Sequence, residues 1–219
     1  VVYALEKVGV RPLTEAYRTL VSQLDVDAIV LVDGGTDIVV FGDEAGLGTP
    51  QEDATSLSAV AALDDIETRL CASIGFGIDA FHGICHAHFL ENVATLEADG
   101  SYLGAFSVPR ATPEGAAFLD AVADAWKATP NRPSIVNGQI AAAIRGERGN
   151  EALSERTRGS ELFVSPLMAV YFTFDVVGLA RRSLIVPRIA HTDTIFEVSA
   201  VIEALREELT LRPRRAIPH

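Results

Sequence analysis

Apolar residues along the chain fall into two patterns, and the two alternate. Continuous apolar runs that stop at glycine predict strands buried on both faces, and they cover residues 28–32 and 68–76. Apolar residues at helical spacing predict helices, and these cover residues 13–24, 49–63, 79–98, 112–127, 134–144 and 194–209. Residues 102–108 and 161–174 have strand-like composition, and residues 146–159 predict a charged loop or a short helix.

This alternation predicts an α/β fold that is Rossmann-like, with a doubly wound, mostly parallel sheet and helices on both faces. Residues 1–219 form one domain on this interpretation. The chain starts at Val1, its only methionine is Met168, and residues 1–9 read like the middle of an element. We therefore expect the C-terminal part of a longer protein, with an exposed apolar sheet edge or a dimer interface near residues 1–10.

The charge of the chain excludes two classes of partner. Among 219 residues, 18 Lys and Arg stand against 30 Asp and Glu, and the net charge is −12. This balance disfavours nucleic acid and anionic membrane surfaces as partners. Short basic clusters, such as Arg212, Arg214 and Arg215, predict a solvated surface. The two cysteines suggest no disulfide framework, and no apolar run has the length of a membrane span, so we expect a cytoplasmic protein.

The acidic residues are concentrated in one glycine-rich segment. Six of the 30 carboxylates lie between Asp33 and Asp53, interleaved with five glycines, directly after a predicted strand. Ligands of open α/β sheets bind at the carboxyl ends of the strands, so Asp33 and Asp37 are candidate catalytic residues. The segment also supplies candidate ligand-binding residues, which are Gly34, Gly35, Thr36, Glu44, Glu52 and Asp53. The alternative is a turn with solvated carboxylates.

The start of the predicted helix at residues 49–63 has its own signals. Thr49 can cap the helix, Pro50 suits its first position, and Glu52 completes a capping box. A helix N-terminus can also bind an anion, but the acidic residues of this first turn already complement the helix dipole. Capping alone explains these residues.

A second polar cluster follows the next predicted strand. On one helix, Asp79, His82 and His86 would share a face, and the two histidines have the i, i+4 spacing that lets two imidazoles bind one metal. All three are candidate ligands of a divalent metal, and His82 and His86 are candidate catalytic residues. A catalytic His–Asp pair without metal is the alternative. If the two strands are neighbours, the acidic segment and this cluster wall one pocket suited to acid–base chemistry.

Three stretches resemble a known family. LVDGGTD, GDEAGLGTPQED and GFGIDAFHGICHAHFLENV are similar to the hallmark stretches of domain-of-unknown-function family 1152, found in bacteria and archaea. The resemblance runs from about Leu13 to the last predicted helix. It implies longer relatives that begin with a strand and a dinucleotide-style, Gly-rich loop, which this chain lacks, and it implies no settled activity. Residues 33–37 also resemble, over a few residues, the glycine loop of D-glutamate cyclases.

Two functions fit these observations. The first is an enzyme, a hydrolase or lyase, that acts on a small polar metabolite by acid–base or metal-assisted chemistry at the carboxyl edge of the sheet. The second is a non-catalytic domain that binds a small molecule or serves as a scaffold. Elsewhere in the sequence the signals for chemistry are weaker.

Overall fold

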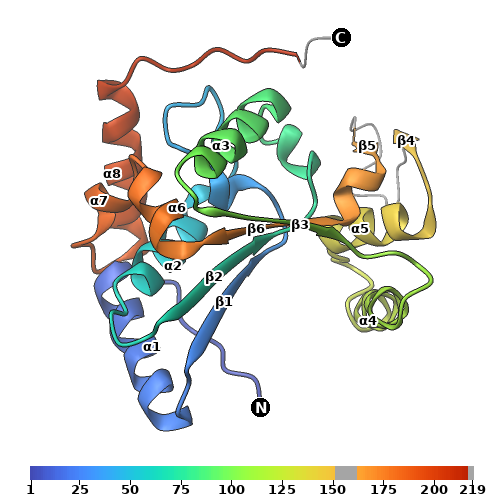
Figure 1. Cartoon of the computed structure of the whole chain (residues 1–219), viewed down its shortest axis with the longest axis horizontal. Coiled ribbons are helices and arrows are strands. Elements are labelled where there is room, and N and C mark those ends of the chain that lie inside the picture. Colours follow the sequence, from blue (N-terminus) through green and yellow to red (C-terminus); the bar gives the residue numbers. More distant parts are fainter. Residues whose placement is uncertain (151–161, 217–219) are drawn as a thin grey trace.

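The structure, a computed structural model, describes residues 1–150 and 162–216 and contains a central sheet with helices packed against it (Figure 1). The strands of this sheet are β1 (Ala28–Asp33), β2 (Thr68–Ser73), β3 (Tyr102–Ser107) and β6 (Val170–Asp175). The α-helices are α1 (Val10–Leu24), α2 (Pro50–Ala61), α3 (His86–Ala98), α4 (Pro113–Ala128), α5 (Ile135–Arg145), α6 (Val176–Arg182), α7 (Val186–Ile189) and α8 (Ile195–Glu208).

Short elements connect these parts. They are the 3-10 helices η1 (Asp37–Val39), η2 (Ile78–Ala80) and η4 (Pro166–Ala169), and a two-stranded ribbon of β4 (Gly149–Asn150) and β5 (Phe163–Val164). Most of the residues predicted as a charged loop at 146–159 lie outside the described residues. In the part of the chain that is described, no helix is both long and apolar enough to cross a membrane.

The central sheet is mixed, which confirms the α/β class and corrects the mostly parallel sheet. Its strand order is β1-β2-β6-β3, with β1 parallel to β2 and with β6 antiparallel to both of its neighbours. Ser107 at the end of β3 pairs with Val170 at the start of β6. After β3 the chain passes through α4 and α5 and re-enters the sheet at the end where β3 left it, so β6 has to run in the opposite direction.

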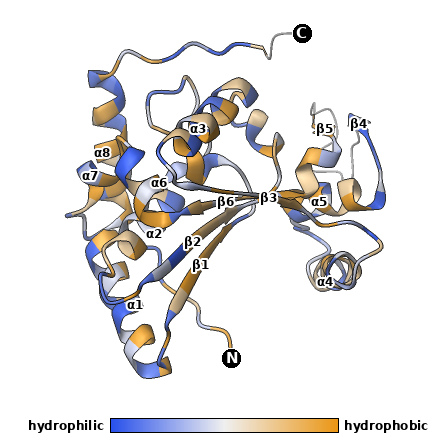
Figure 2. Cartoon of the chain, viewed as in Figure 1, coloured by the Kyte–Doolittle hydropathy of each residue, from blue (hydrophilic) through white to orange (hydrophobic). Residues whose placement is uncertain are grey.

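One face of the sheet carries the core. Cys71 of β2 and Phe174 of β6 are completely buried there, packed with residues of α2, α3 and α6. On the opposite face of β1, Val30 and Val32 are 53% and 64% exposed. Figure 2 shows β1 in the colour of apolar residues. The doubly wound arrangement with both faces of β1 buried is therefore wrong for the described chain, although the continuous apolar run predicted it.

Helix α2 is held on several sides, and this fixes the direction of its first turn. It packs against α1, β1 and η1 and against the C-terminal helices α6, α7 and α8. Leu57 and Val60 of α2 belong to the core under the sheet, whereas Ala54 packs with a second apolar cluster that includes residues of α7 and α8. A side chain at the N-terminus of α2 is thus carried by a rigid element.

The predicted helix at residues 79–98 is wrong in its first turns. The chain forms η2 after β2, then a turn, and α3 begins only at His86. Gly77 and Gly83 have positive φ angles of +92° and +103°, which a residue inside an α-helix does not adopt. Gly83, which lies between the two histidines, therefore breaks the single helix that the apolar spacing predicted.

Candidate metal centre

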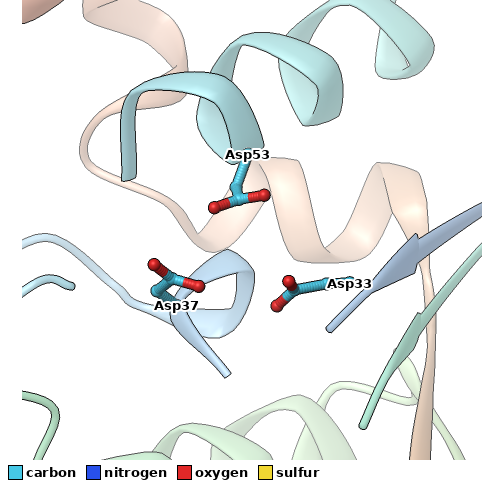
Figure 3. Close-up of side chains that lie close together, drawn as sticks. All are labelled: Asp33, Asp37 and Asp53. Atoms are coloured by element: carbon cyan, nitrogen blue, oxygen red, sulfur yellow. The ribbon is translucent and has the colours of Figure 1, made fainter. Parts of the chain in front are cut away.

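Three aspartates from three different elements point toward one another (Figure 3). Asp33 is the last residue of β1, Asp37 is the first residue of η1, and Asp53 lies in the first turn of α2. One carboxylate oxygen from each lies within 4.8 Å of the others. This spacing would allow all three carboxylates to bind one cation.

The β1–β2 pairing brings a fourth aspartate to the same place. Asp33 is in register with Ser73 of β2, and the amide of Ile74 donates to the carbonyl of Asp33 at 3.0 Å. The two strands are parallel neighbours, as the predicted convergence required, so the loops after both strands meet at one edge. Asp79, in η2 after β2, reaches the cluster from this second loop.

Gly35 lies at the centre of the carboxylates. A Cβ atom built on Gly35 would lie 2.9 Å from Asp79 Oδ2, 3.1 Å from Asp37 Oδ1 and 3.4 Å from Asp33 Oδ1. The approach of these three carboxylates therefore requires a residue without a side chain at this position. Ser73 Oγ donates to the carbonyl of Gly35 at 2.6 Å and fixes the loop against β2.

Neighbouring backbone and hydroxyl groups orient two of the carboxylates. Thr49 donates from its amide and its hydroxyl to Asp37 Oδ2, at 2.8 and 3.2 Å. Thr36 donates in the same way to Asp79 Oδ2, at 2.6 and 3.1 Å. Each aspartate keeps its second oxygen for another partner. Thr49 makes no capping hydrogen bond to α2, so the predicted capping box is wrong and the hydroxyl serves Asp37 instead.

Burial and mutual repulsion make it harder to ionise three carboxyls of the site, Asp33, Asp53 and Asp79, unless a cation balances the charge. Burial, followed by the charges of the other aspartates, raises the pKa of Asp33 to about 8, of Asp53 to about 7 and of Asp79 to about 6. Asp33 Oδ2 is buried and has no hydrogen-bond partner among the described residues. The ion pairs found between described residues involve none of these four aspartates.

These features fit a hard divalent cation such as Mg²⁺, Mn²⁺ or Ca²⁺. Such ions prefer carboxylate oxygen ligands, and a buried oxygen without a donor is the kind of atom that a cation satisfies. Asp33, Asp37 and Asp53 would hold the ion, and Asp79 lies beside them.

The comparison with protein families identifies the chain's relatives. The model of a family described as "Protein of unknown function (DUF1152)" matches residues 1–210. The chain belongs to the DUF1152 family. No curated protein and no solved structure matches it. The match confirms the resemblance carried by the three sequence stretches. The family description assigns no activity, so the chemistry of this DUF1152 chain must be argued from its site.

The two histidines of this DUF1152 chain lie in different environments. His82 is exposed in the turn after η2, and its amide donates to the carbonyl of Asp79 at 2.9 Å. His86 is the first residue of α3, where its ring packs on Phe76 with centroids 5.1 Å apart, and burial lowers its pKa. The shared helical face is therefore absent, and the metal-ligand role of both histidines stays a prediction.

Two of the predicted acidic ligands have other partners. Glu44 is only 2% exposed, and its carboxylate accepts hydrogen bonds from the amides of Phe41 and Gly42, from Asn92 and from Arg212. It stabilises the loop before α2. The side chain of Glu52 is exposed and pairs with Lys7. Among the other predicted ligand-binding residues, Gly34 is exposed, whereas Thr36 is buried beside Asp79.

Sequence reasoning missed three residues around the cluster. The first is Thr49, which the sequence predicts as a helix cap but which donates to Asp37. The one sequence signal for this role is the glycine before it, Gly48. Gly48 has a φ of +68°, and a Cβ atom there would lie 2.5 Å from Asp37 Oδ2. The other two are Arg212 and Arg214, which were predicted to be solvated but contact the loops of the site. No local pattern marks the partners of a residue 130 or more positions away.

Proposed function

We propose that this DUF1152 chain is an enzyme that acts on a small polar metabolite by metal-assisted hydrolysis or elimination. The observation that carries the proposal is the convergence of Asp33, Asp37 and Asp53, with one buried oxygen of Asp33 lacking a donor. Oxygen ligands alone favour Mg²⁺ or Mn²⁺ over softer metals. A divalent cation of this kind polarises a substrate oxygen and lowers the pKa of a bound water.

The chain's own residues divide the remaining work. Asp33, Asp37 and Asp53 hold the cation, and Thr49 keeps one oxygen of Asp37 in place. Asp79 and His82 supply the proton transfer. His82 is exposed to solvent in the same turn as Asp79, so it can exchange protons with solvent, whereas the ring of His86 is half-buried against Phe76. In this proposal the three aspartates bind the cation, and Asp79 and His82 beside them act as acid and base.

A screen for turnover tests the proposal. The purified chain is incubated with small phosphate esters, amides and hydroxy acids, with Mg²⁺ or Mn²⁺ present and with a chelator as the comparison. We expect metal-dependent turnover of one substrate class. Asp53→Asn should abolish it, and His82→Ala should reduce it by about 100-fold. The exposed Asp64 offers a matched control, because Asp64→Asn removes the same charge beyond the C-terminal end of α2, whereas Asp53 lies in its first turn.

The outcomes separate the two functions. Metal-dependent turnover that Asp53→Asn and His82→Ala leave unchanged would overturn the assignment of this site. Metal binding without turnover of any class would favour the alternative, a non-catalytic domain that binds its ligand at the same cluster. In that case Asp53→Asn should still weaken binding of the metal.

A further inference from the structure

The segment after α8 lies across the two loops that carry the aspartates. Figure 1 shows it running from the end of α8 over the loop before α2 and over α3. The amide of Arg212 donates to the carbonyl of Asp43 at 2.7 Å, and its side chain donates to Asp43 Oδ1 at 2.8 Å and to Glu44 Oε1 at 3.1 Å. Arg212 therefore anchors the segment to the loop before α2.

The same guanidinium also reaches α3. Arg212 Nη1 lies 3.3 Å from Glu91 Oε2, and its Nη2 lies 3.3 Å from Asn92 Oδ1. Arg215 pairs with Glu91 as well. The three acidic partners of Arg212 are Asp43 and Glu44, from the loop before α2, and Glu91, from α3. These hydrogen bonds are charge-assisted, and the groups that make them are partly buried. Together they hold the segment more firmly than a single surface ion pair would.

Arg214 carries this anchor to the turn that holds Asp79. Its Nε donates to the carbonyl of Gly83 at 3.2 Å, and its Nη2 lies 3.4 Å from the carbonyl of Ala80. The backbone of this turn closes on Asp79, because the amides of His82 and Ile84 both donate to the carbonyl of Asp79. A guanidinium on two of the turn's carbonyls therefore restricts the backbone that sets the position of the Asp79 carboxylate.

A close backbone contact joins the same turn to the loop before α2. A Cβ atom on Gly83 would lie 3.1 Å from Gly46 Cα and 3.2 Å from Arg214 Nη2. The turn is thus packed between the loop before α2 and the C-terminal segment. Movement of either one would move the turn that carries Asp79.

We propose that residues 212–215 form a strap across the site and that Arg214 is a positioning residue, which holds the turn at residues 79–84 so that Asp79 faces the aspartate cluster. The strap lies beyond the residues that the family model matches, which end at 210. The inference rests on the proposed cation site for its functional consequence, whereas the strap itself can be tested without any metal.

The experiment compares the full chain with its Arg214→Ala and Arg214→Lys variants. Hydrogen exchange of the amides in residues 80–84, measured in chelator, reports on the strap. Titration with Mn²⁺, followed by the loss of the free-ion electron paramagnetic resonance signal, reports on the site. Arg188→Ala is the matched control, because Arg188 is exposed and pairs with Glu208 away from the cluster.

We expect Arg214→Ala to speed exchange at residues 80–84 but not in α8. It should also weaken Mn²⁺ binding by about tenfold, because the negative charge of Asp79 acts on Asp33 and Asp53 and would move away with the turn. Arg214→Lys should restore part of both, since its ammonium can reach a carbonyl. Unchanged exchange in Arg214→Ala would overturn the strap. Faster exchange with unchanged Mn²⁺ affinity would overturn the positioning role. A wild-type chain that binds no Mn²⁺ would refute the proposed function, while the exchange result would still decide the strap.

Discussion

At the scale of single residues, Gly35 decides how closely the aspartates can approach. Its neighbour Gly34 is a matched control for a substitution at Gly35. A Cβ atom on Gly34 would meet only Val136 Cγ1, at 3.2 Å, rather than carboxylate oxygens. Neither glycine has a positive φ angle, so an alanine at either position brings no backbone strain. The two positions differ mainly in what the added methyl group touches.

We therefore predict that Gly35→Ala weakens Mn²⁺ binding by at least about tenfold, because the methyl group displaces the carboxylates and costs on the order of 1–3 kcal/mol of packing strain. Gly34→Ala should bind nearly as well as the wild type. Calorimetric titration of both variants, with thermal melting to verify folding, provides the measurement. Equal affinities in the two variants would refute the central position of Gly35.

The raised pKa values of the cluster predict how stability depends on pH. Asp33 has a folded pKa of about 8 against an ordinary value of 3.8, so between these values the folded state binds more protons than the unfolded state. Its contribution to stability is therefore present at low pH and is lost as the pH rises toward 8. Asp53 and Asp79, with pKa values of about 7 and about 6, act in the same direction.

In chelator, Asp33→Asn should therefore be more stable than the wild type at about pH 8, by about 2 kcal/mol, and the difference should shrink toward about pH 5. Urea unfolding across this pH range measures the effect. The reverse order in saturating Mn²⁺ is expected, since the variant loses a ligand. A difference that does not change with pH would contradict the raised pKa of Asp33.

At the scale of elements, the turn between β2 and α3 separates the histidines. Gly83 combines a φ of +103° with a Cβ position 3.1 Å from Gly46 Cα, whereas Gly100 has a φ of +77° and open space around it. A substitution at either glycine strains the backbone, but only Gly83 is also confined by a second loop. The pair therefore isolates the contact between the two loops of the site.

We predict that Gly83→Ala lowers the free energy of unfolding by about 1–2 kcal/mol more than Gly100→Ala does, because it adds a clash to the shared backbone strain. Chemical denaturation of the two variants measures the difference. Gly83→Ala should also weaken Mn²⁺ binding, whereas Gly100→Ala should not. Similar losses of stability in both would show that the loops do not depend on this contact.

The sequence predicted these elements unequally, and the reasons are local. Buried runs that end in glycine predicted the loops after β1 and β2 and their meeting at one edge. The cluster of Asp33, Asp37 and Asp53 follows from that placement. The apolar spacing of residues 79–98 could not reveal that Gly83 breaks the helix. Partners of Arg212 and Arg214 depend on tertiary contacts that no local pattern encodes.

At the scale of the whole molecule, the sequence pattern could not predict the direction of the strands or which faces of the sheet are buried. An apolar strand reads the same in either direction, so the antiparallel β6 could not be distinguished from a parallel strand. The run at residues 28–32 predicted burial on both faces, yet Val30 and Val32 are exposed, as are Val1 and Val2. Residues 1–9 belong to no strand of either sheet, so the sheet edge expected there is not found, and the dimer interface near residues 1–10 stays a prediction.

The whole-molecule architecture brings the two loops to one edge of a mixed sheet, and the central claim is that this edge binds a divalent cation. The free protein holds protons on the cluster at about pH 7, since the pKa values of Asp33 and Asp53 are about 8 and about 7. A cation that replaces these protons must release them. The measured heat of binding is therefore expected to depend on the ionisation enthalpy of the buffer, which accepts the released protons.

The most direct test is calorimetric titration of the wild-type chain with Mn²⁺ at about pH 7, in two buffers of different ionisation enthalpy. We predict saturable binding that releases on the order of one proton. Asp33→Asn should lose this binding, and the control Asp64→Asn should keep it. Absence of binding to the wild type, or equal binding by the wild type and Asp33→Asn, would contradict the account.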